Sequence, residues 1–365
     1  MLNVEISAVT IDSKSKLDFL YDNNHIEKSF IDFGLFCSSK WNKVWSTLHL
    51  SPRDFISVQL HFSQSKLIAV YPLYLKKISF GYELRFLGSG EPEHTEVCSE
   101  FQDFIIAPEF IDESLVLFTK HVKQLKQCYR ISFDKILPDS ICYKWLKHYQ
   151  TLGWYYHEHF IGKRFILSIV NNEQAQVTQL EQATLRRQAR RFIERTDITV
   201  EQCTSEKELP NFFEVLIKLH NLYWQKKGKL GAFSSEQFRQ FHRRFASMML
   251  EQQKLLMFKL RYKDDVIAVF YGFYHKGVVY YYQSGISLNS PLLNTGVAMH
   301  LTAMRYARAC GYQYYDLMTG QDSSYKQQYV KAATPVYTVK LSIFWHTALN
   351  LISKLKLLLR VYKEK

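Results

Sequence analysis

The sequence predicts an α/β (α+β) fold made of two domains, each with a mixed, mostly antiparallel sheet. Three observations support this prediction. The 365 residues are enough to build two separate cores. A strand–turn–strand pattern in the first half recurs in the second half. Residues 278–318 read as strand, polar turn, helix and strand, an alternation typical of α/β proteins.

The recurring pattern is a hairpin. VQLHFSQSKLIAVYPLY at 58–74 and FKLRYKDDVIAVFYGFY at 258–274 each give a strand, a short polar turn, Ile-Ala-Val and an aromatic continuation. One such hairpin in each half favours a duplicated α/β unit. We therefore predict a first domain over residues 1–170 and a second over 171–340.

Periodicity places the elements in order along the chain. In the first half we expect strands at 4–11, 57–62, 66–76, 81–88, 101–107 and 129–133, and helices near 16–20, 41–48 and 114–128. In the second half we expect helices at 174–195, 207–226, 235–252 and 295–310. Strands are expected there at 255–262, 266–274, 278–283 and 312–318. Gly311 is placed to end the fourth helix.

Composition narrows the class of protein. Apolar residues make up 47% of the chain and charged residues 22%, which is typical of a globular, soluble protein. Six scattered cysteines show no pair or Cys/His cluster with metal-ligand spacing, so we expect reduced thiols, a cytoplasmic protein and no metal. The N-terminus lacks a signal pattern, and no apolar run of 18 residues is present.

Charge is distributed unevenly. Residues 1–150 hold 17 Lys and Arg against 18 Asp and Glu, a net charge of −1, whereas residues 151–365 hold 30 against 16, a net charge of +14. A basic field attracts a polyanionic cofactor, an anionic sugar, lipid headgroups or nucleic acid. The charge alone does not choose among these partners.

The strand, turn and helix at 278–310 form a candidate phosphate site. Backbone N–H groups at a helix N-terminus and the helix dipole both favour an anion, and Asn294, Thr295 and Gly296 stand at that position. This geometry suits the pyrophosphate of a coenzyme A thioester, which indicates an acyltransferase. The competing explanation is an ordinary helix cap made by Asn294. In the first half, Glu91 and Glu93 follow the Gly88–Gly90 turn and would repel a pyrophosphate, so we place the cofactor in the second half.

Several segments carry a resemblance to a known family. They are Thr184 to Arg191, Leu219-His220, Tyr223-Trp224, Ser290-Pro291, Tyr315-Asp316-Leu317 with Gly320, Tyr325-Lys326, and in the first half 71–74 and 84–88. In this order they resemble the bacterial acyltransferases of the GNAT superfamily grouped with the cellulose-biosynthesis protein CelD (BioF2-like acetyltransferases). More distantly they resemble FemAB-type peptidyltransferases. Leu292 and Leu293 depart from the family, which usually has glycine directly after Ser-Pro.

The resemblance implies two tandem GNAT-like (acyl-CoA N-acyltransferase) domains, the first of them degenerate. It implies transfer of an acyl group, in particular from acetyl-CoA, to an amine of an envelope or exopolysaccharide-related acceptor. In that fold, one strand diverges from its neighbour and binds the pantetheine arm. The expected cofactor-binding residues are Gln283, Ser284, Gly285, Leu293, Asn294, Thr295 and Gly296.

Four residues are catalytic candidates. Acyl transfer to an amine benefits from a base, for which Asp316 and His220 are candidates. Tyr325 can protonate the leaving thiolate, and Lys326 can hold an anionic group. Each also has a structural explanation, as a paired carboxylate, a half-buried histidine, or a solvated lysine.

Acceptor binding is assigned to Arg187, Arg191 and Trp224. The arginines lie on a basic helix and can bind a phosphorylated or acidic acceptor, although a solvated face and core packing of Trp224 explain the pattern equally well. Few aromatic residues are interleaved with these arginines, so nucleic acid is an unlikely partner.

The final segment, 341–365, is predicted to form an amphipathic basic helix. Its apolar residues are spaced by four and three along the chain: Leu341, Trp345, Ala348, Ile352, Leu355, Leu359 and Tyr362. Such a helix can lie on an anionic membrane surface, bind a partner, or pack on its own domain. An enzyme peripheral to the inner membrane is therefore included in the prediction.

Two other functions stay open. A FemAB-like enzyme would use aminoacyl-tRNA instead of acyl-CoA, and the basic helix would then contact RNA. A non-catalytic scaffold of a polysaccharide synthase complex would need none of the catalytic candidates.

Overall fold

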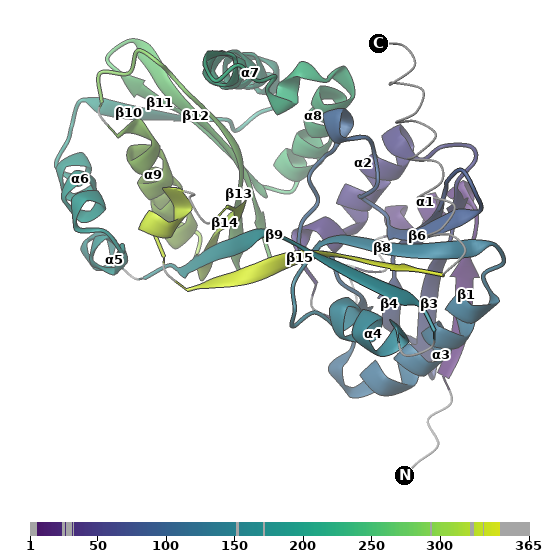
Figure 1. Cartoon of the computed structure of the whole chain (residues 1–365). Coiled ribbons are helices and arrows are strands. Elements are labelled where there is room, and N and C mark those ends of the chain that lie inside the picture. The colour runs from purple at the N-terminus through teal and green to yellow at the C-terminus, as the bar shows by residue number, and fades with distance from the viewer. Residues whose placement is uncertain are drawn as a thin grey trace, which may run out of the picture. The chain divides into compact units, whose positions relative to one another are not determined.

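The computed structural model describes residues 6–23, 26, 31, 33–150, 153–170, 172–292, 294–321, 325–330 and 332–343. The chain forms two compact units, shown with their elements in Figure 1. Unit 1 contains residues 1–91, 98–161 and 336–365, and unit 2 contains residues 92–97 and 162–335. The chain passes from one unit to the other within two strands, β9 (Tyr155–Ser168) and β15 (Ala333–Ser342).

Unit 1 contains two groups of strands. The first is antiparallel, in the order β1 (Ile6–Ile11), β3 (Val58–Ser63), β4 (Lys66–Tyr71) and β7 (Ile105–Ile106). The second has the order β15, β8 (Cys128–Ile136), β6 (Tyr82–Phe86), β5 (Leu73–Lys77) and β2 (Phe55–Ile56). Within it β6 and β8 are parallel, and the other pairs among the described residues are antiparallel.

Unit 2 contains one series of paired strands. Its order is β10 (Ile198–Gln202), β11 (Leu255–Tyr262), β12 (Asp265–His275), β13 (Val278–Ile286), β14 (Tyr314–Gly320) and β9. Only β13 and β14 are parallel. Both units therefore have mixed, mostly antiparallel sheets, which confirms the predicted fold class.

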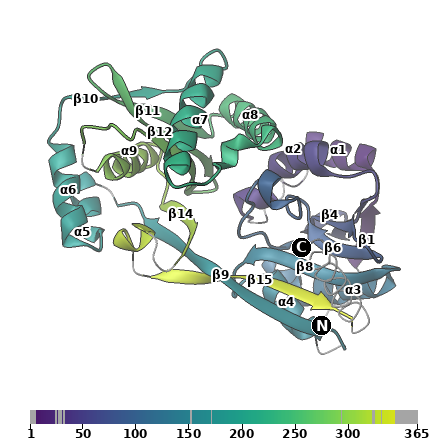
Figure 2. The same cartoon turned by 45° about the horizontal axis from the view of Figure 1, so that its top comes forward.

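Helices cover both faces of strands β11 to β13 in unit 2. On one face α9 (Thr295–Ala309) and α6 (Ala183–Ile193) enclose a core that includes Phe258, Phe270 and Met304. On the other face α7 (Leu209–Lys226) and α8 (Glu236–Glu251) pack on Tyr271 and its neighbours. Figures 1 and 2 show α9 and α7 on opposite sides of these strands. Alternation of side chains along each strand produces the two buried faces.

Helices of unit 1 are α1 (Lys14–Asp22), α2 (Ser39–His49), α3 (Ile111–Gln124) and α4 (Ile141–Tyr149). An aromatic core forms where α3 and α4 meet the strands: Tyr71 stacks on Phe118 with ring centroids 4.1 Å apart, and Trp145 lies 5.0 Å from Phe118. Several of the aromatic residues of the first half thus share one core.

The repeated hairpin is confirmed, because β3–β4 and β11–β12 are both antiparallel hairpins with an irregular register. The two copies differ near the end of the repeated segment. Pro72 lacks an N–H group and separates β4 from β5, so the first copy is divided between two groups of strands. Gly272 occupies the comparable place in β12, where the strand continues through a bulge.

Several boundaries differ from the prediction. The chain passes from unit 1 to unit 2 between residues 161 and 162 and returns between residues 335 and 336, and residues 92–97 also belong to unit 2. The units are therefore not the two continuous segments that we expected. The helix predicted at 174–195 is two helices, α5 (Glu173–Gln179) and α6, with Leu180 to Gln182 between them. Strands β9, β10 and β15 and helix α4 were not predicted.

The predicted tail helix does not begin at Leu341. Leu341 and Ser342 end strand β15, with Leu341 paired to Ile131 of β8. Strand pairing and full burial of Leu341 outweigh the helical spacing of its apolar neighbours. Residues 344–365 lie outside the described residues, so the rest of this prediction is not tested.

The bulge that β13 forms opposite Gly272 of β12 predicts the effect of Gly272→Ala. A Cβ at residue 272 would lie 2.3 Å from the carbonyl oxygen of Tyr280, a backbone atom that cannot move aside alone. We expect a loss of about 1–3 kcal/mol in the free energy of unfolding, measured in urea. Gly296→Ala is the control, because its Cβ would meet only Ile286 Cδ1 at 3.5 Å. Equal losses in both variants would contradict this account.

Candidate functional site: a divergence of two parallel strands in unit 2

Strands β13 and β14 pair over a short distance and then separate. Their parallel register contains three pairs, the last of which joins Tyr280 to Asp316. Beyond that point residues 281–286 of β13 continue to pair with β12. Among the described residues, no register joins this part of β13 to β14. One backbone edge of β13 therefore faces a gap rather than a neighbouring strand.

A bulge in β13 lies at the start of the gap. Tyr271 of β12 pairs with Gln283, and the adjacent Gly272 pairs with Tyr281, so Tyr282 is an inserted residue. A bulge redirects the backbone and interrupts the ladder. The Tyr282 hydroxyl donates to the carbonyl oxygen of Val97, in the 92–97 segment that belongs to unit 2.

An ion pair holds β14 where the strands separate. Asp316 is fully buried, and its Oδ2 accepts from Arg164 Nε at 2.8 Å and Nη2 at 2.6 Å. Its Oδ1 accepts from the Met318 amide at 2.8 Å. Met318 has a φ of 64°, and the β14–β9 register shifts between Asp316 and Thr319. The carboxylate therefore fixes an irregular turn of β14 and attaches it to β9.

The first turn of α9 is the candidate anion site, and its first residue, Thr295, is buried. Asn294 precedes the helix but makes no side-chain cap hydrogen bond, so the ordinary cap proposed from the sequence is not formed. Within the described part of the chain, no acceptor pairs with the amides of Thr295 and Gly296. Among the described residues, a Cβ on residue 296 would meet only Ile286 Cδ1 within 4 Å. Helix α9 has no acidic residue in its first turn.

The corresponding corner of unit 1 is closed. Strands β6 and β8 are its parallel pair, and α3 is the helix that leads into β8. Gln102, 1% exposed, donates to the carbonyl oxygen of Leu87 just beyond β6. The first turn of α3 carries Asp112 and Glu113, which disfavour an anion at that helix N-terminus.

Aromatic side chains from four elements meet beside the gap. His300 of α9 is buried, with Nδ1 2.7 Å from the Tyr315 hydroxyl and Nε2 3.4 Å from the Tyr325 hydroxyl. The Tyr281 ring lies 4.7 Å from the His300 ring, and the Tyr281 hydroxyl is 2.7 Å from Ser284 Oγ. These contacts link the open edge of β13 to α9, β14 and the turn η6 (Tyr325–Gln328).

Burial sets the protonation states in this cluster. Burial, and then the charge of Lys326, lower the pKa of His300 to about 3, so this ring is neutral at physiological pH. Burial also raises the pKa of Tyr325 well above its usual value. Part of the Tyr325 side chain is exposed (45%), yet its hydroxyl is turned inward to His300. Tyr325 is therefore a protonated hydroxyl near the surface.

His220 of α7 lies against the same part of β13. Its Nδ1 is 3.1 Å from the Ser284 carbonyl oxygen, and because a carbonyl only accepts, Nδ1 carries the hydrogen. Nε2 then carries the lone pair; this nitrogen is buried, and it has no hydrogen-bond partner among the described residues. Burial lowers the pKa of His220, and the bond to Ser284 partly opposes this change. A neutral ring with an unused basic nitrogen is a competent proton acceptor.

The structure places the other predicted residues as follows. Gln283 and Gly285 lie on the open part of β13, and a Cβ on Gly285 would meet the α7 backbone at 2.9 Å. Lys326 Nζ donates to the Thr319 carbonyl oxygen at 2.7 Å, near the end of β14. Leu293 lies outside the described residues. The predicted donor-site residues and Tyr325, Lys326 and His220 thus surround one part of unit 2.

The predicted acceptor residues divide into two groups. Trp224 lies on α7 with its ring 6.1 Å from that of His220. Arg187 and Arg191 are exposed on α6. The segment before α6 contacts η6, because the Glu181 and Gln182 amides donate to the Gln328 carbonyl oxygen at 3.2 and 3.4 Å. The first turns of α6 are therefore attached to the turn that holds Tyr325.

Two residues of the site were missed in the sequence. His300 lies in a buried apolar helix and has no motif around it. Arg164 lies in a strand that was not predicted, 152 residues from Asp316. The one available signal for His300 was its position, five residues after Thr295 on the helix that follows the candidate phosphate turn. Among the described residues there is no cluster of His, Cys, Asp or Glu able to hold a metal, and no helix long and apolar enough to cross a membrane.

Comparisons with known proteins agree with this geometry. Residues 181–327 match the acetyltransferase (GNAT) domain family. A search of curated protein sequences found no match. Among solved structures, the chain is similar to FemX, with a TM-score of 0.62 and 13% identity over 95% of this chain and 99% of that one.

Two further structures resemble the whole chain. One is the C-terminal domain of a putative lysylphosphatidylglycerol synthetase from Agrobacterium fabrum, with a TM-score of 0.54 and 13% identity over 93% of this chain and 95% of that one. The other is L-PGS from Bacillus licheniformis, with a TM-score of 0.52 and 13% identity over 90% and 91%. Residues 181–327 thus match a GNAT acetyltransferase domain, and the fold of the chain is similar to the folds of these three proteins. The comparisons do not distinguish the CelD group.

The ion pair at the strand divergence predicts a mutational pattern. Arg164→Met leaves the Asp316 carboxylate buried without its cation, which we expect to lower the free energy of unfolding by about 3–5 kcal/mol. Adding Asp316→Asn removes the charge and retains an oxygen that accepts from Met318, so the double variant should be more stable than Arg164→Met alone. Denaturant unfolding of all four forms measures the coupling. Losses that simply add would contradict the role given to this pair.

Proposed function

We propose that the chain is an N-acyltransferase that transfers an acyl group, in particular acetyl, from an acyl-CoA to an amine. The observation that carries the proposal is the open edge of β13 beside an uncapped α9 N-terminus. A thioester of coenzyme A presents amide groups along its pantetheine arm and two phosphates at its nucleotide end. Unit 2 offers a complementary surface to each of these parts.

Donor binding is assigned to two groups of backbone atoms. Residues Gln283 to Gly285 offer main-chain donors and acceptors to the pantetheine amides, as a strand does for an added neighbour. The Thr295 and Gly296 amides hold the pyrophosphate, assisted by the dipole of the 15-residue helix α9. The closed corner of unit 1 supports a degenerate first domain, with one donor site in the chain.

His220 and Tyr325 are assigned the two proton transfers. His220 Nε2 takes a proton from the acceptor amine as its nitrogen bonds to the thioester carbonyl carbon. When the carbon–sulfur bond breaks, Tyr325 gives its hydroxyl proton to the leaving thiolate. His300 accepts from Tyr315 at Nδ1 and donates Nε2–H to the Tyr325 oxygen, which turns the Tyr325 hydrogen outward. Solvent returns the proton from His220 to the Tyr325 phenolate.

Asp316 and Lys326 receive different roles from those first expected. The Arg164 and Met318 contacts occupy both carboxylate oxygens of Asp316, so it positions β14 rather than acting as base. Lys326 stands at the end of β14, where its charge can stabilise the carbonyl oxygen as it becomes negative. The hydrogen bond from the Lys326 ammonium to the Thr319 carbonyl oxygen, 2.7 Å long, holds this charge in place.

The acceptor is proposed to be an amine on an envelope or exopolysaccharide-related molecule. Its binding is assigned to Trp224, Arg187 and Arg191. The ring of Trp224 beside His220 gives an apolar wall next to the proposed base. The exposed guanidinium groups suit a phosphate or carboxylate on the acceptor.

An aminoacyl-tRNA donor is the second candidate. It is favoured by the similarity to FemX over nearly the whole of both chains and by the exposed arginines of α6. An RNA would use the basic surface of residues 151–365, whose net charge is +14. Such a donor needs no pyrophosphate at α9, and this difference separates the two candidates.

Calorimetric titration with acetyl-CoA tests the donor. We expect saturable binding to the parent chain and a loss of at least about tenfold in affinity for Gly296→Val, because its branched side chain fills the space beside the α9 amides. Thermal unfolding confirms that the variant is folded. Ala183→Val, at an exposed position at the start of helix α6, should bind like the parent. Binding of charged tRNA with none of acetyl-CoA would replace the first candidate by the second.

Kinetics of thiol release from acetyl-CoA with a panel of amines test the chemistry. Tyr325→Phe should lower kcat by about 10²–10⁴-fold with little change in the KM for acetyl-CoA, since it removes the acid and leaves the donor site. Tyr314→Phe, which changes an exposed tyrosine at the start of β14, is the control. A scaffold without catalytic activity would show no amine-dependent thiol release in any form.

The pH profile separates His220 from the other candidates. A base acts when neutral, and burial lowers the pKa of His220 below the ordinary value of 6.5. The acidic limb of log kcat/KM should therefore fall with a midpoint below pH 6.5, and His220→Gln should remove that limb as well as lowering the rate. A limb that persists in His220→Gln would assign the base elsewhere.

A further inference from the structure

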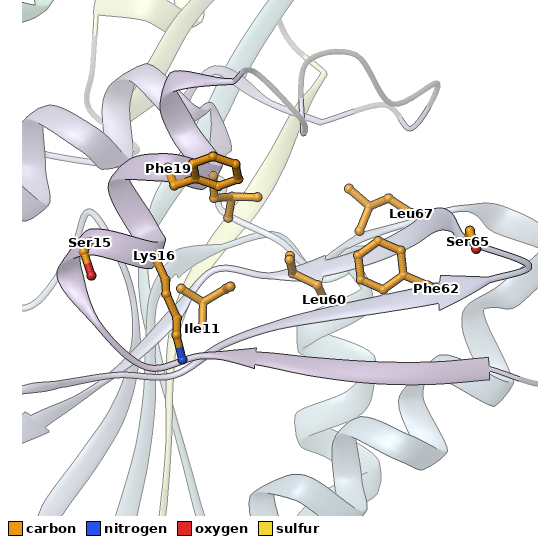
Figure 3. A pocket seen from close by; sticks show the side chains of 9 residues that line it. Ile11, Ser15, Lys16, Phe19, Leu60, Phe62, Ser65 and Leu67 are labelled. Atoms are coloured by element: carbon orange, nitrogen blue, oxygen red, sulfur yellow. The ribbon is translucent and has the colours of Figure 1, made fainter.

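Unit 1 contains a cavity that the proposed reaction does not use. It has a volume of about 610 Å³, is partly open to solvent, and lies between helix α1 and strands β1, β3 and β4. Figure 3 shows its side chains arranged as an elongated trough beneath α1. The volume is in the range of small-molecule sites, about 300–1,000 Å³. The matched GNAT domain, 181–327, does not include it.

The wall of the trough is apolar. Six of its residues share this character: Ile11, Phe19, Leu20, Leu60, Phe62 and Leu67. Leu60 lies near the middle, while Phe62 and Leu67, which pair across the hairpin, lie toward the hairpin turn (Figure 3). Phe19 stands on α1 above them and is 67% exposed. An apolar surface of this kind gains free energy when a hydrocarbon covers it.

One end of the trough is cationic. Lys16 extends from α1 past Ile11 toward β1 (Figure 3) and is the one charged residue among the described lining residues. Its ammonium is 2.8 Å from Asp12, and both side chains are more than half exposed, at 57% and 62%. An exposed ion pair is held weakly, so an anion at the mouth can share or replace Asp12. Ser15 is at this end, and Ser65 at the hairpin end.

The shape of the trough and its one charged side chain indicate which class of molecule it binds. A protein partner needs a broad surface of about 800 Å² on each side, whereas this site is a narrow concave trough. A neutral hydrocarbon would leave Lys16 unused. A linear molecule with one alkyl chain and one anionic head matches both the apolar wall and its single cationic end.

We propose that this trough binds a single-chain anionic amphiphile of the fatty-acid type. The alkyl chain lies along Leu60 between Phe19 and the Phe62–Leu67 pair, and the carboxylate lies at Lys16. This site is distinct from the thioester site of unit 2 and does not depend on the reaction proposed there.

Displacement of a fluorescent polyene fatty acid, cis-parinarate, tests the proposal on the full chain. We expect saturable binding of one molecule, displaced by dodecanoate at lower concentration than by dodecanol or dodecyltrimethylammonium. Phe19→Ser should weaken binding by at least about tenfold, and Lys16→Gln by about threefold to tenfold. Both side chains are largely exposed, so circular dichroism and unfolding should be unchanged.

Two variants elsewhere in unit 1 are matched controls. Phe80→Ser removes another exposed phenylalanine (48%), and Lys120→Gln removes an exposed lysine on α3. Both should bind cis-parinarate like the parent. Absence of saturable binding, equal binding by Phe19→Ser, or equal displacement by the three head groups would overturn the proposal. So would a dimer in sedimentation that Phe19→Ser dissociates without any probe binding, since the trough would then be an interface with a second copy.

Discussion

The buried ion pair of Arg164 and Asp316 is the constraint on which the proposed site depends. A parallel pair of strands would ordinarily continue its ladder, but β14 turns away after Asp316, and the carboxylate accepts from Arg164 on β9 and from the Met318 amide. The two contacts from Arg164 hold β14 to β9, its other neighbour, while β13 keeps its pairing to β12. The gap between them is therefore built into the backbone. A buried charge pair of this kind is more valuable for the geometry it specifies than for net stability.

The two units have a similar order of elements, yet one corner is open and the other is closed. Each unit has an antiparallel hairpin, a parallel pair and a helix leading into the second strand of that pair. In unit 1, Gln102 fills the corner and acids occupy the first turn of α3. In unit 2 the corresponding helix begins without a cap and without an acid. A few local residues thus convert one framework into a structural unit and the other into a candidate enzyme. The excess of basic residues, at 151–365, lies in the same half of the sequence as the open corner.

Local patterns in the sequence were sufficient for the fold class and for the helix and strands around the proposed donor site. The hairpins, the helix at 295–310 and its end at Gly311 were predicted because each is encoded within about fifteen residues, and Gly311 has a φ of 74°. Strands β9 and β15 were missed because they pair with partners far away in the sequence, and their polar residues alternate weakly. The role of Asp316 was misjudged for the same reason, since its cation is 152 residues away. His300 was missed because a buried histidine in an apolar helix gives no sign of the tyrosines it contacts.

The central claim is that the backbone edge of β13 and the amides of α9 bind an acyl-CoA. Hydrogen exchange of the full chain, followed by mass spectrometry with and without acetyl-CoA, tests this claim directly. The account predicts slower exchange in peptides that contain residues 281–286 and 294–297, with no change at β6 and α3 of unit 1. Protection confined to other segments, or no protection at saturating acetyl-CoA, would contradict it.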